Sequence, residues 1–132
     1  MTISYALYDN RLTPDPDDCR ALVQFAGVVD LDKVIERMIE RGSTTTKADA
    51  LAVLQDYHAA IESLVLEGFK VNTPGANYGA SVKGVFDDLS DDFDKTRHQV
   101  AASVSPGAQF RRTVRKNARL QKRTLADPAL FS

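Results

Sequence analysis

A dense run of cations lies near the C-terminal end of this 132-residue chain. Residues 111–123, RRTVRKNARLQKR, contain seven Lys and Arg side chains and no acid. This density exceeds what solubility requires, and these are the side chains that neutralise nucleic-acid phosphates. Three interpretations follow: the run contacts DNA, it is a solvated tail, or it pairs with the acidic body of a neighbouring copy.

The remainder of the chain is acidic. Residues 1–110 contain 10 Lys and Arg against 17 Asp and Glu, although the formal net charge of the whole chain is only −1. The densest acidic cluster consists of Asp87, Asp88, Asp91, Asp92 and Asp94. It lacks the turn glycine and the distal glutamate of an EF-hand loop, so we expect no calcium site there. Residues Asp87–Asp94 would repel phosphate and could instead mimic nucleic acid or dock a basic protein partner.

Residues for other chemistries are few. His58, His98 and Cys19 lie far apart in the sequence, which is more typical of structural residues than of metal ligands. The segment NTPGANYG lacks the Gly-Lys-Ser/Thr of a nucleotide-binding loop, and no G-x-S-x-G nucleophile motif is present. We therefore predict that the protein is not an enzyme, binds no metal and uses no cofactor.

Length and composition indicate one globular domain with a small extension. The chain is 43% hydrophobic and 27% charged, which is ordinary for a water-soluble fold. It has no apolar run near the roughly 20 residues that span a bilayer, and its N-terminus does not resemble a secretory signal. The single cysteine excludes an internal disulfide framework and fits a reducing cytosol. These features predict a cytoplasmic location.

The clearest predicted element is a long amphipathic helix over residues 47–67. Thr46 can cap it, and Gly68 can end it in a left-handed conformation. Residues at spacings of three and four form one apolar face: Leu51, Leu54, Tyr57 or His58, Ile61, Leu64 and Val65. Because such a face is not stable in water, the rest of the chain or a second copy must cover it.

A shorter helix precedes the long one. Leu31, Val34, Ile35, Met38 and Ile39 share one face of the segment LDKVIERMIERG. Asp30 is its predicted N-cap and Gly42 its end, and a Ser-Thr-rich turn leads into the long helix. The pair is a helix-turn-helix in the loose geometric sense.

Alternation of apolar and polar residues predicts strands on both sides of the helices. Residues 3–8 and 19–26 can pair as an antiparallel hairpin. Residues 69–71, 78–86 and 98–104 can form a three-stranded antiparallel sheet. A type II turn at Pro74-Gly75 joins the first two of these strands, and Ser105-Pro106-Gly107 leads from the last strand into a short basic helix.

The order of two helices, three strands, Ser-Pro-Gly and a basic helix resembles the bacterial histone-like family of HU and integration host factor proteins. The resemblance covers residues 31–114, and VNTPGANYG and VSPGAQFRRTV carry it at the turn and at the exit. The phrase FDKTRHQV resembles the HU-related DNA-binding domain that opens with an additional N-terminal strand segment.

This resemblance implies the expected fold class: an α+β, HU/IHF-like fold of two N-terminal helices, a three-stranded antiparallel sheet with a shortened arm, a C-terminal helix and an N-terminal β extension. The expected segments are a β extension over residues 1–27, an HU-like domain over 28–120 and a C-terminal tail over 121–132. Family members are dimers, and their β-arms bend DNA with a proline wedge. The resemblance therefore implies a homodimer that binds DNA in the bacterial nucleoid.

The sequence departs from the family pattern at the arm. Residues 85–97 are short, rich in aspartate and free of proline, so arm-mediated bending is not expected. The cations left for duplex DNA lie at the arm base and around the last helix, and they suit sequence-independent contacts with the backbone. They are Lys83, Arg97, Arg111, Arg112, Arg115 and Lys116. The alternative function is a protein-interaction module of the same fold whose acidic arm has reduced or abolished DNA binding.

Overall fold

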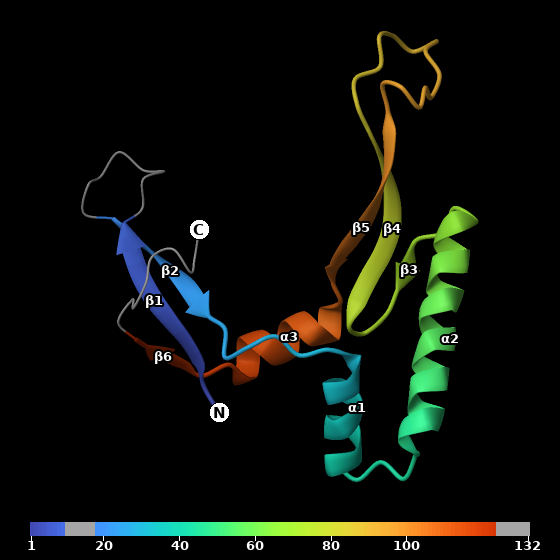
Figure 1. Cartoon of the computed structure of the whole chain (residues 1–132). Coiled ribbons are helices and arrows are strands. Elements are labelled where there is room, and N and C mark those ends of the chain that lie inside the picture. The colour runs from blue at the N-terminus through green and yellow to red at the C-terminus, as the bar shows by residue number, and fades with distance from the viewer. Residues whose placement is uncertain (10–17, 124–132) are drawn as a thin grey trace. The chain divides into compact units, whose positions relative to one another are not determined.

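The computed structural model describes residues 1–9 and 18–123. Its described part contains three helices and two three-stranded sheets (Figure 1). The elements in chain order are β1 (Ile3–Asp9), β2 (Cys19–Gln24), α1 (Leu31–Glu40), α2 (Lys47–Leu66), β3 (Val71–Asn72), β4 (Ala76–Lys83), β5 (Gln99–Pro106), α3 (Ala108–Asn117) and β6 (Leu120–Lys122). No helix in this described part is both long and apolar enough to cross a membrane.

The predicted fold class is wrong in its order and in its number of sheets. The chain does not open with two helices beside one sheet: it opens with β1 and β2, and these strands belong to a second three-stranded sheet. The sequence does not predict the second sheet because its third strand, β6, has only three residues. Strong positive charge in that segment hides the alternation of Leu120 with its polar neighbours. The predicted C-terminal tail from residue 121 onwards overlaps this strand, and residues 124–132 lie outside the described part.

The contacts divide the chain into two compact units, residues 1–34 with 114–132 and residues 35–113. The sheet of the first unit has the order β2-β1-β6. The predicted hairpin of β1 and β2 is confirmed, with Tyr5 opposite Val23. Strand β6 then joins β1 in parallel, with Ile3 beside Leu120.

Hydrogen bonds at both ends of β6 hold the second half of the basic run in this sheet. The Ile3 N–H donates to the Arg119 carbonyl over 2.7 Å, and the Arg123 N–H donates to the Tyr5 carbonyl over 2.8 Å. The Arg123 guanidinium also donates to the Ser4 hydroxyl over 2.8 Å. The basic run is therefore not a free tail, because its first half lies in α3 and its second half pairs with β1.

The second unit contains α2, and the predicted signals at its ends are confirmed. The Thr46 hydroxyl accepts from the Asp49 N–H over 3.2 Å, which satisfies one of the free donors at the helix start. Gly68 follows the helix with φ +96°, and Gly42 follows α1 with φ +105°. Both glycines adopt the left-handed conformation that other residues rarely take.

The sheet of the second unit has the antiparallel order β3-β4-β5, as predicted. The connection between β3 and β4 is not the predicted type II turn, because Gly75 does not have the positive φ that this turn requires. Instead, the Thr73 hydroxyl organises the turn. It accepts from the Ala76 N–H over 3.0 Å and donates to the Ala76 carbonyl over 2.6 Å.

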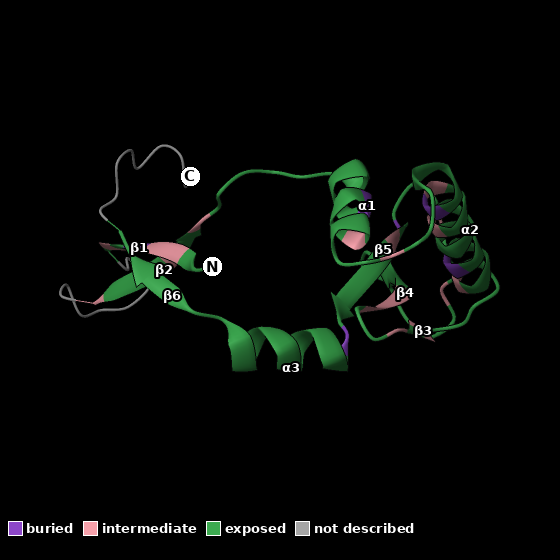
Figure 2. Cartoon of the chain, turned by 90° about the horizontal axis from the view of Figure 1, so that it is seen from below, coloured by how far each residue is buried: buried purple, intermediate pink, exposed green. Residues whose placement is uncertain are grey.

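The core of a single chain is small. Among the described residues, the buried hydrophobic side chains are Ala6, Ile35, Ala50 and Ile61 (Figure 2). Within the predicted apolar face of α2, Ile61 is buried, whereas Tyr57 and Leu64 are exposed. A unit with so few buried side chains has little hydrophobic stabilisation by itself, and its exposed apolar surface is available for a partner.

Candidate nucleic-acid interface

Helix α3 carries four exposed cations on one side. Arg111, Arg112, Arg115 and Lys116 occur at spacings of one and four residues, which places them along a common side of an α-helix. All four are exposed, and within the described ranges none of them forms an ion pair. They can therefore meet the phosphates of a nucleic acid without first breaking an interaction in the chain.

The start of α3 is fixed by backbone contacts with the β3–β4 turn. The Gly107 N–H donates to the Gly75 carbonyl over 3.0 Å, and the Phe110 N–H donates to the Pro74 carbonyl over 3.1 Å. Gly107 is buried, and a Cβ atom built on it would overlap the carbonyl groups of Thr73 and Pro74. Only glycine allows this close approach, so the Ser-Pro-Gly exit recognised in the sequence sets the position of the basic helix.

The β4–β5 hairpin has an apolar face, which the alternation in the sequence predicts, and a polar face that the sequence analysis did not single out as a binding surface. Side chains two apart in a strand share a face, as do directly paired residues of antiparallel strands. The polar row consists of Asn77, Gly79, Ser81 and Lys83 on β4 with Gln99, Ala101, Ser103 and Ser105 on β5. The apolar row consists of Tyr78, Ala80 and Val82 with Val100, Ala102 and Val104. The period-two alternation of small polar residues in both strands was the available signal.

The predicted DNA contact Lys83 lies in the polar row. It is exposed, stands opposite Gln99 and precedes the loop that connects the two strands. Small side chains along the rest of this row leave the sheet surface open to a large ligand. Lys83 therefore extends a polar surface rather than standing alone at the arm base.

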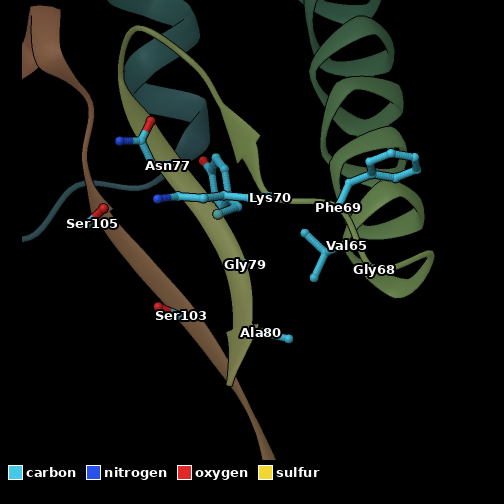
Figure 3. Close-up of a pocket in the computed structure, with 10 residues that line it drawn as sticks. Val65, Gly68, Phe69, Lys70, Asn77, Gly79, Ala80, Ser103 and Ser105 are labelled. Carbon is cyan, nitrogen blue, oxygen red and sulfur yellow. The ribbon is translucent and has the colours of Figure 1, made fainter. Parts of the chain in front are cut away.

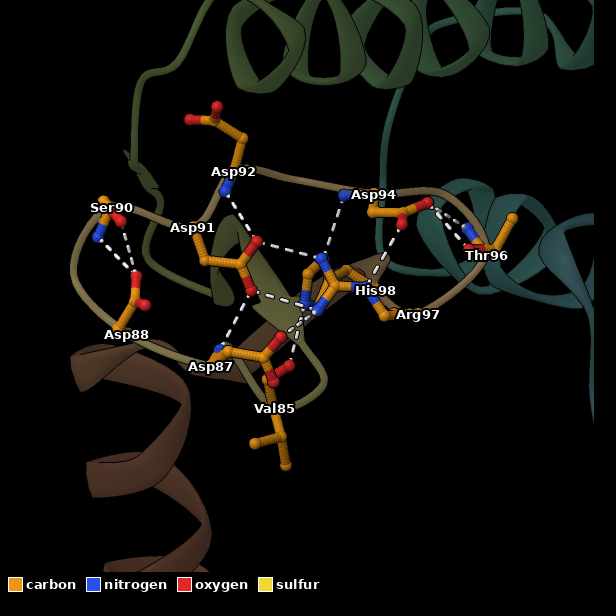
Figure 4. A network of polar contacts seen from close by, with 10 residues as sticks. All are labelled: Val85, Asp87, Asp88, Ser90, Asp91, Asp92, Asp94, Thr96, Arg97 and His98. Atoms are coloured by element: carbon orange, nitrogen blue, oxygen red, sulfur yellow. Dashed lines mark hydrogen bonds and ion pairs between the residues drawn. The ribbon is translucent and has the colours of Figure 1, made fainter.

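The arm loop, residues 84–98, is organised by one arginine (Figure 4). Arg97 donates to both carboxylate oxygens of Asp91, over 3.0 and 2.9 Å, in the paired geometry that suits a guanidinium. It also donates to Asp94 over 3.1 Å and to Asp87 over 3.3 Å. Three of the five clustered aspartates thus share one cation, and the loop presents less negative charge than its sequence indicates.

These contacts lower the pKa values of the aspartates. Hydrogen bonds from Arg97, and then from the Asp87 N–H, hold the pKa of Asp91 well below its usual range. Hydrogen bonds from Thr96, followed by those from Arg97, lower the pKa of Asp94 to about 2. The same pairing raises the pKa of Arg97. The pKa values fall because these hydrogen bonds are made to the charged form of each carboxyl group.

His98 anchors the inner side of the arm loop. Its Nδ1 accepts from the Asp94 N–H over 2.9 Å, so its Nε2 carries the proton and donates to the Val85 carbonyl over 2.9 Å. The Phe86 ring stacks on the imidazole with centroids 3.7 Å apart. This buried histidine is structural, as the sequence predicted, and the described residues contain no group of side chains suited to hold a metal ion.

The six predicted contact residues thus fall into three environments. Lys83 lies in the polar row and Arg97 lies inside the arm loop, whereas the remaining four share the exposed side of α3. Arg97 has most of its hydrogen-bond donors engaged by carboxylates, so its predicted role in DNA contact remains a prediction. The exposed cations of α3 form the strongest candidate for a phosphate-binding surface.

A family model described as a DNA-binding domain, HU-DNA_bdg, matches residues 2–123 of the chain. The chain belongs to this family. The match includes the N-terminal strands and β6, so the two-sheet arrangement lies within the domain.

A solved structure shares this fold. It is the crystal structure of a "Putative bacterial DNA binding protein" from Bacteroides vulgatus ATCC 8482, with a TM-score of 0.79 and 16% sequence identity. The superposition covers 96% of this chain but 50% of that protein, so the chain spans about half the length of its structural relative. No curated protein sequence matches the chain.

Proposed function

We propose that this protein binds duplex DNA without sequence preference, through contacts with the phosphate backbone, and acts as an architectural protein of the bacterial nucleoid. The observation that carries this proposal is the row of four exposed, unpaired cations on a helix whose start is fixed to the sheet. The DNA-binding family of the chain supports it. The residues proposed to contact DNA are Lys83, Arg111, Arg112, Arg115 and Lys116.

The proposed activity is binding rather than catalysis, and contact with the DNA backbone requires no base-reading element. Arginine and lysine on α3 can release counterions from DNA, and this effect is independent of sequence. We favour DNA binding over the alternative of a basic protein partner because Arg97 already engages three carboxylates of the arm loop. The loop is consequently a weaker mimic of a nucleic acid than its five aspartates suggest.

We propose that the protein is a homodimer. The apolar row of the β4–β5 hairpin leaves Val82, Val100 and Val104 exposed by 56%, 60% and 63%, and Tyr57 and Leu64 of α2 are exposed as well. Burying such side chains typically contributes about 1.5–3 kcal/mol each. We propose that a second copy of the chain covers these exposed apolar side chains. Light scattering should show a dimer at micromolar concentration, and a monomer throughout this range would contradict the proposal.

The direct test of DNA binding is fluorescence anisotropy with a labelled duplex at several salt concentrations. The wild-type chain is compared with a variant that carries Arg111→Gln, Arg112→Gln, Arg115→Gln and Lys116→Gln. Because each phosphate contact contributes about 0.9 to the slope of log K against log salt, this variant should lose about 3.6 from the slope. Its affinity near 0.1 M salt should fall roughly 10³–10⁴-fold.

A matched control separates local contacts from net charge. Lys33→Gln, Arg37→Gln, Arg41→Gln and Lys47→Gln remove the same number of cations from exposed positions on and beside the first two helices. This control should retain most of the slope. Equal losses in both variants would mean that overall charge, rather than α3, governs binding, and no binding by the wild type at low salt would overturn the proposed function.

A further inference from the structure

A cavity of about 400 Å³ lies in the second unit, where the end of α2 meets β4 and β5. Besides the Tyr78 phenol, four polar side chains line it: Lys70, Asn77, Ser103 and Ser105. Figure 3 shows these four on one side of the hairpin, whereas the Ala80 methyl group and Val65 lie on the other side. The cavity is large enough for a sugar-phosphate unit, since small-ligand sites range from about 300 to 1,000 Å³.

The strand register explains why this cavity is open. Asn77 stands opposite Ser105, and Gly79 stands opposite Ser103. Gly79 has no side chain, and a Cβ atom placed on it would meet nothing within 4 Å. The gap at Gly79 therefore gives a ligand access from the β4 edge to the two serine hydroxyls on β5.

The lining has the chemistry of an anion site. It combines one ammonium group, one amide, two serine hydroxyls and the Tyr78 phenol, and all of these groups can donate hydrogen bonds. None of the residues that line the cavity is an aspartate or glutamate, although residues 1–110 carry 17 acids against 10 cations. A neutral substrate would not require the lysine, and a cation would be repelled by it. The class of ligand that fits is a phosphate ester.

The cavity is continuous with the proposed DNA surface. Asn77, Gly79, Ser103 and Ser105 belong to the same polar row as Lys83. The six steps from Asn77 to Lys83 extend about 20 Å along β4. A DNA strand whose phosphates contact Lys83 can therefore reach the cavity along one open face of the hairpin.

We infer that this cavity binds a phosphodiester group of the DNA backbone, with Lys70 supplying the charge and Asn77, Ser103 and Ser105 supplying hydrogen bonds. The inference rests on the proposed function and adds a second contact surface to α3. Phosphate held at the cavity and phosphate held at α3 would fix the duplex at two positions, which orients it more firmly than a single cationic helix.

The test uses the full chain with Lys70→Gln, and Lys47→Gln as the matched control at the other end of α2. Lys70→Gln should reduce the salt slope of duplex binding by about 0.9 and the affinity near 0.1 M salt by roughly 5–10-fold. Lys47→Gln should change neither quantity. The double variant Ser103→Ala and Ser105→Ala should weaken binding while leaving the slope unchanged, because it removes hydrogen bonds but no charge.

Amide chemical shifts of the wild type identify the position and the source of the phosphate. Titration with the duplex should move the amides of Lys70, Gly79 and Ser103, and inorganic phosphate at constant ionic strength should move the same amides more weakly. Shifts with inorganic phosphate alone would indicate a small-anion site and overturn the inference. An unchanged slope in Lys70→Gln, with binding still lost in the α3 variant, would overturn it while the proposed function stands. If the wild type binds no duplex, both fail.

Discussion

The arm loop and helix α3 carry opposite charges, and they differ most in how that charge is used. In the loop, Arg97 contacts Asp87, Asp91 and Asp94, and these contacts hold the loop together. On α3, the four cations form no ion pair with any described residue. The comparison shows that a charge count along the sequence does not measure the charge available to a partner, because part of it stabilises the fold.

The largest expected effect concerns how α3 is attached. Gly107→Ala places a methyl group against the Thr73 and Pro74 carbonyls, and the turn must move to accept it. Overpacking of this kind costs about 1–3 kcal/mol, so the melting temperature should fall by roughly 5–10 °C. Calorimetry measures the change. Gly75→Ala is the control, because its Cβ would meet nothing within 4 Å, and an equal loss there would refute the close-approach argument.

The next effect tests whether the loop depends on its internal charge. Arg97→Gln leaves three carboxylates without their shared cation, so amide hydrogen exchange over residues 86–98 should accelerate by about tenfold or more. Duplex affinity should fall only a few-fold, with the salt slope unchanged, because the loop becomes more acidic. A slope lower by about 0.9 would instead show that Arg97 contacts a phosphate, as the sequence predicts.

Lowering the pH should affect the arm loop but not the charge of α3. Asp91 and Asp94 have pKa values below the ordinary value of 3.8, so their stabilising contribution is complete above pH 3.8 and is lost as pH falls towards 2. The arginines of α3 remain charged throughout this range. The carboxyl carbon shifts of Asp91 and Asp94 should therefore hold constant from pH 7 to about pH 4 and change below it. In Arg97→Gln the change at Asp91 should begin at higher pH.

The smallest expected effect comes from an aspartate that the loop does not need. The Asp92 carboxylate forms no ion pair or hydrogen bond with the residues that the structure describes, whereas its backbone N–H donates to Asp91. Asp92→Lys should leave the exchange rates of the loop unchanged and strengthen duplex binding by a few-fold. Asp91→Lys is the contrasting variant, and it should disrupt the loop. Equal exchange rates in the two variants would remove the distinction between paired and unpaired aspartates.

The local elements could be predicted because their signals lie within a few residues. Thr46 and Gly68 mark the two ends of α2, and both act as expected. The fold class could not be predicted, because the partner of β6 lies more than a hundred residues away and a three-residue strand carries almost no periodic signal. The turn type at Gly75 was missed because the Thr73 hydroxyl determines its geometry.

The candidate site was partly visible in the sequence. The cations of residues 111–116 were identifiable because their spacing already places them on one side of a helix. The pairing of Arg97 with the loop aspartates was not identifiable, because it depends on how a long loop folds back on itself. The cavity lining was not visible, because Lys70 precedes β3 and Ser103 lies on β5, and only the pairing of β3, β4 and β5 brings them to one cavity.

The parallel pairing of β1 with β6 has a consequence for the order in which the protein forms during synthesis. Ile3 cannot meet Leu120 until nearly the whole described chain has left the ribosome, whereas every contact of the second unit lies within residues 35–113. A β1–β2 hairpin without its third strand is at best marginally stable in water. We therefore expect the second unit to fold first. Strand β1 pairs with β6 only after more than a hundred further residues have been translated.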